Sequence, residues 1–174
     1  MSAIDNTPSN KNFLSPLNFR FNIKKAPHVN FFIQRVNIPS IELPSPVAPS
    51  EFVKVPYPGE HINYGDLDIS FKVDEDLQNY LELHTWLRGL SDTKDYIERA
   101  ALDAIPNYTG DGTTFDISLI ILNSAKNPNY QVVFQDAFPT ELGDVVFDST
   151  DSDINYVTCE AKFKYTLYEI SRFV

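Results

Sequence analysis

The sequence predicts an α+β fold, mainly β, with two packed antiparallel sheets in a sandwich or barrel-like arrangement, one main helix and a long proline-rich loop. Three observations support this prediction. Residues 66–73 alternate polar and apolar, as in a half-buried strand. Residues 77–90 place apolar side chains three and four apart, as on one face of a helix. Residues 39–58 contain six of the twelve prolines.

Length and charge limit the possible classes of protein. A chain of 174 residues fits one domain, which we place at residues 17–174, after a flexible N-terminal arm at residues 1–16 that is rich in Ser, Asn and Pro. The formal net charge of −10 opposes tight binding to nucleic acid through its phosphates. No segment approaches the roughly 20 apolar residues of a membrane span, so we expect a soluble protein without a membrane anchor.

The first elements are expected to form a hairpin. Residues 18–24 alternate cleanly, with Phe19, Phe21 and Ile23 on the buried face of a strand. Residues 31–38 form a second apolar segment after Pro27, and their closeness predicts antiparallel pairing with the first strand.

The proline-rich segment at residues 39–58 is expected to leave the central sheet, because proline cannot donate a ladder hydrogen bond. Residues 51–55 are expected to form a short strand or hairpin tip within it. Loops of this length are usually functional or mobile.

The strand at residues 66–73 is expected to enter a helix through Asp74, Glu75 and Asp76, which suit the positive end of a helix dipole. The predicted buried stripe is Leu77, Tyr80, Leu81, His84, Leu87 and Leu90, broadened by Leu83 and Trp86.

Later segments predict a second, shorter helix at 94–104 and strands at 114–122, 130–136 and 145–147, with a bend between Pro139 and Gly143. The last strand, at 156–170, shows the longest alternation. Its inward face includes Cys159, expected to be a small core residue, and its outward face includes Glu160, Lys162 and Lys164.

No pattern in the chain predicts catalysis. The three histidines lie far apart, the acidic segment 148–153 lacks the glycine and distal glutamate of an EF-hand loop, and Gly110 and Gly112 do not form a phosphate loop. We therefore expect no enzyme, no metal site and no cofactor.

The order of elements resembles a known family. An opening strand of the type Asn18-Phe19-Arg20-Phe21 is followed by residues 32–39, the proline-rich segment, and the strand and helix that contain Trp86 and Leu87. Residues 138–143 and the long closing strand come later. This order resembles the tail tube proteins of contractile-tailed bacteriophages, which are similar in fold to the type VI secretion tube.

The resemblance implies a structural protein of the virion tail, assembled in the host cytoplasm. Its subunits would form hexameric rings that stack into a tube through which genomic DNA leaves without specific binding. It further implies contacts with tail sheath, baseplate and tape-measure proteins. The proline-rich segment would contact the neighbouring ring, through Leu43, Pro44, Val47, Pro49, Glu51, Phe52 and Val53. Glu160, Lys162 and Lys164 would face the lumen or an interface.

Two other interpretations remain open. The first is a protein of the same fold that initiates the tube at the baseplate or forms a type VI secretion tube. The second is a monomeric β-barrel that binds a small ligand in an apolar pocket.

Overall fold

The computed structural model describes residues 11–49, 52–91, 113–148, 150 and 155–173. The expected helix at 94–104 and residues 149 and 151–153 of the acidic segment lie outside these residues, as does most of the expected arm. The described elements are β1 (Phe19–Ile23), α1 (Pro27–Phe32), β2 (Ile33–Val36), β3 (Ile41–Glu42), β4 (Val47–Ala48), β5 (Val55–Pro56), β6 (Asn63–Tyr64), β7 (Leu67–Lys72), α2 (Gln78–Leu90), β8 (Phe115–Leu122), β9 (Pro128–Leu142), β10 (Thr158–Lys164) and β11 (Leu167–Arg172).

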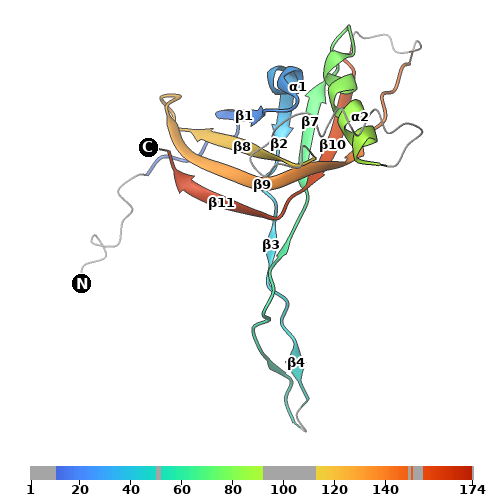
Figure 1. The fold of residues 1–174 in the computed structure, drawn as a ribbon. Helices are drawn as coiled ribbons and strands as arrows, with labels where there is room; N and C mark the ends of the chain where they lie inside the picture. The colour runs from blue at the N-terminus through green and yellow to red at the C-terminus, as the bar shows by residue number, and fades with distance from the viewer. Residues whose placement is uncertain (1–10, 50–51, 92–112, 149, 151–154, 174) are drawn as a thin grey trace.

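The predicted mainly β, α+β class is confirmed. The main sheet has seven antiparallel strands, of which six lie in the order β1-β8-β9-β10-β7-β2 and the seventh, β11, pairs with β9 (Figure 1). The two expected sheets are therefore two parts of one bent sheet that share β9. Among the described strands β1 and β2 lie at opposite ends of this order, so the sheet does not close into a barrel.

Strand β9 is continuous for 15 residues, whereas the sequence predicted a strand that ends at 136 and a bend at Pro139. Two irregularities let it turn without ending. Gln135 and Asp136 together oppose Asp116 of β8, and Asp136 adopts a left-handed conformation at φ 54°. A second register shift lies opposite Lys162, next to Pro139, where the missing amide hydrogen is tolerated.

The expected single closing strand is two strands. β10 pairs with β7 and with the last residues of β9, whereas β11 pairs with residues 130–135 of β9. The chain turns at Tyr165 and Thr166, and the Thr166 amide donates to the Gln135 carbonyl at 3.0 Å. The strand breaks because it follows the bend of β9.

The expected hairpin at the start of the chain is wrong. β1 pairs with β8 and β2 pairs with β7, at opposite ends of the sheet. Helix α1 separates them, with Pro27 in its first turn. The Asn30 side chain accepts from the Ile23 amide at 2.8 Å and donates to the Ile23 carbonyl at 3.0 Å, which fastens α1 to the end of β1.

Strand β7 agrees with the prediction, since Leu67, Ile69 and Phe71 are buried. The helix that follows begins later than expected, at Gln78, and no carboxylate caps it. Asp74 instead accepts from the Asp76 amide at 3.2 Å in a turn, and Leu77 is left-handed at φ 57°.

The buried face of α2 consists of Asn79, Leu83, Trp86 and Gly89, so the predicted stripe is displaced around the helix. Leu77 and Leu81, which we expected to be buried, are 39% and 51% exposed. Trp86 fixes the helix face. Its ring contacts Phe115 of β8 and Phe163 of β10, and its indole nitrogen donates to the Thr113 carbonyl at 3.0 Å.

Of three further expectations, two are confirmed and one is wrong. Strand β8 is confirmed, with Ile117 and Leu119 buried. Residues 145–147 form no strand, and Val146 and Phe147 are exposed. Cys159 is buried as expected, and its thiol lies 3.4 Å from the Gly143 carbonyl.

Replacing Trp86 tests the packing of α2 on both parts of the sheet. Trp86→Ala is expected to lower the free energy of unfolding by about 3–5 kcal/mol, because it leaves a large cavity. Leu81→Ala, on the exposed side of the same helix, should change it by less than about 0.5 kcal/mol. Denaturant titrations followed by circular dichroism at one protein concentration measure both values, and equal losses would contradict the assigned helix face.

The single cysteine provides a second test of the core. Burial raises the pKa of the Cys159 thiol from 9.0 to about 11. At pH 8 the folded protein should therefore hold roughly 100-fold less thiolate than the unfolded chain. A colorimetric thiol reagent should react slowly with the folded protein and rapidly in denaturant. Rapid reaction of the folded protein would place Cys159 outside the core.

Candidate assembly interface

The most prominent surface feature among the described residues is a two-stranded segment, residues 39–49 and 52–65, which we term the ribbon. It projects from the central sheet as a long extension (Figure 1). Strand β3 pairs with β6 near its root, and β4 pairs with β5 nearer its tip. Backbone bonds between the pairs complete it: Gly65 to Ser40 at 2.9 Å, Gly59 to Pro44 at 2.8 Å and Tyr57 to Pro46 at 2.9 Å.

The prolines explain why the ribbon stays separate from the central sheet. Their carbonyls still accept, as Pro44 and Pro46 do, but they offer no amide hydrogen to a further strand. Gly59 is required opposite Pro44, because a Cβ at position 59 would overlap the Pro44 carbonyl. The predicted excursion outside the sheet is confirmed.

The ribbon exposes apolar side chains. Of the expected contact residues, Leu43, Val47, Phe52 and Val53 are exposed at 49%, 51%, 91% and 66%. Pro44 and Pro49 are also exposed, whereas Glu51 lies outside the described residues. Four more exposed apolar side chains on the ribbon were not singled out from the sequence: Ile41, Val55, Tyr57 and Ile62. The sequence could have identified them, because apolar side chains in a segment outside the sheet have few core residues to pack against.

Two tyrosines hold the root of the ribbon, and sequence reasoning missed their role. The Tyr165 hydroxyl donates to the Gly65 carbonyl at 2.9 Å, and the Tyr168 hydroxyl donates to the Pro39 carbonyl at 3.1 Å. Burial raises the pKa of Tyr165 to about 12, so its hydroxyl remains a donor at neutral pH. The two bonds join residues that are 100 and 129 positions apart, and no local sequence pattern signals such pairs.

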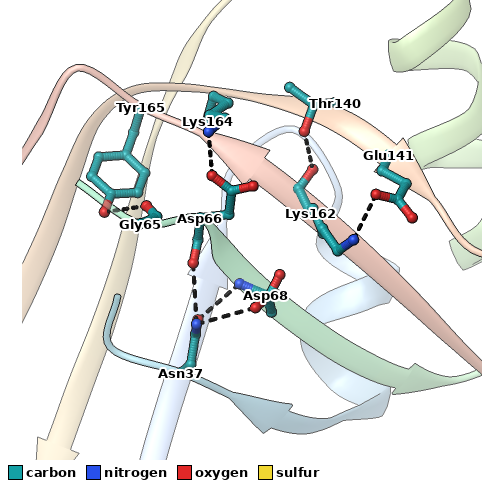
Figure 2. Close-up of polar contacts among 9 residues, drawn as sticks. All are labelled: Asn37, Gly65, Asp66, Asp68, Thr140, Glu141, Lys162, Lys164 and Tyr165. Carbon is teal, nitrogen blue, oxygen red and sulfur yellow. Dashed lines mark hydrogen bonds and ion pairs between the residues drawn. The ribbon is translucent and has the colours of Figure 1, made fainter. Parts of the chain in front are cut away.

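The outward face of β10 is polar, as predicted, and both of its lysines are paired. Lys162 forms an ion pair with Glu141 at 2.7 Å, and Lys164 forms one with Asp66 (Figure 2). The hydrogen bond to Glu141 raises the pKa of Lys162. Glu160 is exposed on the same face. The sequence placed these residues on one face but did not identify their partners.

Asn37 extends this polar face to the start of the ribbon. Its side-chain nitrogen Nδ2 donates to the Asp66 carbonyl at 3.1 Å, and its side-chain oxygen accepts from the Asp68 backbone amide at 2.8 Å. Figure 2 shows these bonds beside the Lys164 and Asp66 pair. Asn37 therefore joins the chain just before the ribbon to the chain just after it.

A groove of about 700 Å³ lies at the end of β7, where α2 begins. Its apolar wall includes Leu77, Phe147 and Tyr156, and its polar side includes Lys72 and Glu75. The ammonium group of Lys72 lies 4.4 Å from the centre of the Tyr156 ring, in a cation–π contact.

In the described part of the chain, no group of three or more metal-binding side chains comes together. His28 is held by Glu82, whose hydrogen bond raises the pKa of the imidazole. No helix in the described ranges is long and apolar enough to cross a membrane.

Known proteins are similar to this chain in sequence and in fold. The sequence matches the family described as phage tail tube protein over residues 8–171. It is 26% identical to the tail tube terminator protein of Enterobacteria phage T4 over 145 residues, which cover 80% of this chain and 76% of that protein.

Two solved structures are similar in fold. The tube-terminating cap of the anti-feeding prophage superposes with a TM-score of 0.62 at 13% identity, covering 99% of this chain and 100% of that one. A type six secretion system protein superposes with a TM-score of 0.53 at 8% identity, covering 88% and 82%. Since the family match spans nearly the whole sequence, this chain belongs to the phage tail tube protein family.

Proposed function

We propose that this protein is a structural, non-enzymatic component of a phage tail that assembles into a hexameric ring and closes the end of the tail tube. The main support for assembly is that the ribbon extends away from the core of its own subunit and exposes apolar side chains. The relationship to a tail tube terminator supports the position at the tube end.

The open sheet supports ring formation. Among the described strands, β1 and β2 end the main order of the sheet, and β11 is paired along one side by β9. Such edges present unpaired backbone groups, which monomeric proteins usually protect. A closed ring would pair the edges of neighbouring subunits and leave none open.

The ribbon is the proposed contact with the adjacent ring. This contact would include Leu43, Pro44, Val47, Pro49, Glu51, Phe52 and Val53. A single ribbon would bury a modest apolar area, but the ribbons of one ring bind together, and their combined affinity can exceed that of one by a factor of about 10²–10⁴.

The outward face of β10 is the proposed lining of the lumen or of a subunit interface. With Lys162 and Lys164 held by carboxylates, this face presents no excess positive charge to DNA phosphates. It would let genomic DNA pass without specific binding, in agreement with the net charge of −10.

A second candidate is the repeating subunit of the tail tube, which family membership favours. That subunit would stack on copies of itself and contact tail sheath and tape-measure proteins, whereas a terminator ring would add once to a finished tube. A tube initiator at the baseplate, or a type VI tube subunit, would share the fold with different partners. As a terminator or as a repeating subunit of a phage tube, the protein would reside in the tail of the virion.

Electron microscopy of the purified protein separates these candidates. We expect single hollow rings whose mass in solution matches a hexamer and which bind one end of tubes assembled from the tube subunit of the same phage. Long tubes formed by this protein alone would instead establish the repeating subunit. A monomer at all concentrations that binds no tube would exclude both.

A change of charge on the ribbon tests its role in ring contact. Val53→Asp is expected to leave rings intact and to reduce binding to tubes by roughly tenfold or more, because a carboxylate would be buried without a partner. Val146→Asp is the matched control, since both valines are 66% exposed and only Val53 lies on the ribbon. Sedimentation of rings with tubes measures binding. Equal binding by Val53→Asp and wild type would exclude the ribbon tip from the contact.

A further inference from the structure

The direction of the ribbon must be set at its root. A two-stranded ribbon has little stability of its own. It joins the body through two segments, which leave at Pro39 and return at Gly65. Any rotation of these segments would be amplified along the ribbon and would displace the tip.

We propose that Tyr165 and Tyr168 are positioning residues that clamp both segments of the ribbon and so fix its direction relative to the sheet. This inference rests on the proposed role of the ribbon in contact between rings. Tyr165 binds the Gly65 carbonyl on the returning segment, and Tyr168 binds the Pro39 carbonyl on the leaving segment. Each hydroxyl therefore holds a different segment, and Figure 2 shows the Tyr165 bond.

The clamp is seated in the core. Tyr64, at the end of β6, packs against Tyr165 at 5.9 Å and Tyr168 at 5.5 Å between ring centres. Phe134 of β9 packs against the same two rings at 5.1 and 5.6 Å. Because Phe134 is fully buried, the contacts form a continuous aromatic path from the core to the ribbon.

Polar contacts also hold the returning segment, and one of them joins it to the chain just before the leaving segment. Asn37 binds the Asp66 carbonyl and Lys164 pairs with the Asp66 carboxylate, next to Gly65 (Figure 2). Lys164 and Tyr165 are consecutive residues at the corner between β10 and β11. The same corner thus holds Asp66 through one side chain and Gly65 through the next, which restricts rotation at the root.

Orientation matters because the ribbons of one ring have to reach their sites together. If a loosened ribbon occupies the competent direction only a tenth of the time, its apparent affinity falls tenfold. Removing the two hydroxyls while keeping the rings should therefore weaken ring contact with little change in the fold.

The test compares Tyr165→Phe combined with Tyr168→Phe against wild type and Tyr130→Phe. Tyr130 is the control because it is a tyrosine of β9 that is 44% exposed and pairs with Arg172 of β11, at the other end of that strand from Leu167. Glu42→Cys, on the ribbon beyond its root, and Thr85→Cys, on α2, carry spin labels in all three proteins, while buried Cys159 stays unlabelled. Labelled chains are diluted into unlabelled protein, and pulsed electron paramagnetic resonance measures the distance between the labels.

We expect the distance distribution of the double variant to be broader than that of wild type and of Tyr130→Phe, with the same circular dichroism spectrum. Binding of unlabelled double-variant rings to tubes should fall roughly tenfold. An unchanged distribution would overturn the clamp. If the double variant does not fold, each single variant is compared in the same way and should show a smaller broadening.

The two measurements separate this inference from the proposed function. A broader distribution with unchanged binding would support the clamp and overturn the role of the ribbon in ring contact. A broader distribution with weaker binding supports both. Weaker binding with an unchanged distribution would overturn the clamp, and the comparison of Val53→Asp with Val146→Asp would then decide the ribbon contact alone.

Discussion

The bend of β9 is the constraint on which the rest of the structure depends. One strand serves two parts of the sheet, pairing with β8 and β11 before the bend and with β10 after it. A strand that changes direction needs an extra residue, and the left-handed Asp136 provides it without a break in pairing. Because β10 and β11 follow the same edge of β9, they turn where it turns. The corner at Tyr165 is thus a consequence of the bend.

That corner connects the core to the surface that we assign to assembly. A ribbon without support would be a poor binding element, since the entropy lost on fixing its direction would reduce affinity. Lys164 reaches the ribbon root from the end of β10, and Tyr165 reaches it from the corner that follows. Because β10 is paired with both β7 and β9, the root is held in place without a partner. The exposed apolar tip can then gain contact area without first ordering its base.

Sequence reasoning succeeded where a local pattern decides the structure. The alternation in β7 and β8 identified their buried faces, and the prolines identified the ribbon, because each depends on neighbours in sequence. It failed where distant pairing decides. Residues 31–38 were assigned to a strand that follows a short turn, but the chain is helical up to Phe32, and Asn30 binds Ile23 and holds that helix in place. The buried face of α2 differs from the predicted stripe because Trp86 packs against β8 and β10. The spacing of apolar residues along a helix does not reveal where those strands lie.

The same distinction separates the parts of the candidate site. The apolar ribbon residues and the polar face of β10 were predictable, because composition and alternation are local. The partners Glu141 and Asp66 and the tyrosine contacts were not, because β9, β10 and the ribbon root meet only after the sheet has formed. Substitutions in the core of β9, such as at Phe134, would therefore reach the ribbon through the clamp. If the ribbon contacts the neighbouring ring as proposed, assembly would depend on core residues as well as on the side chains at the interface.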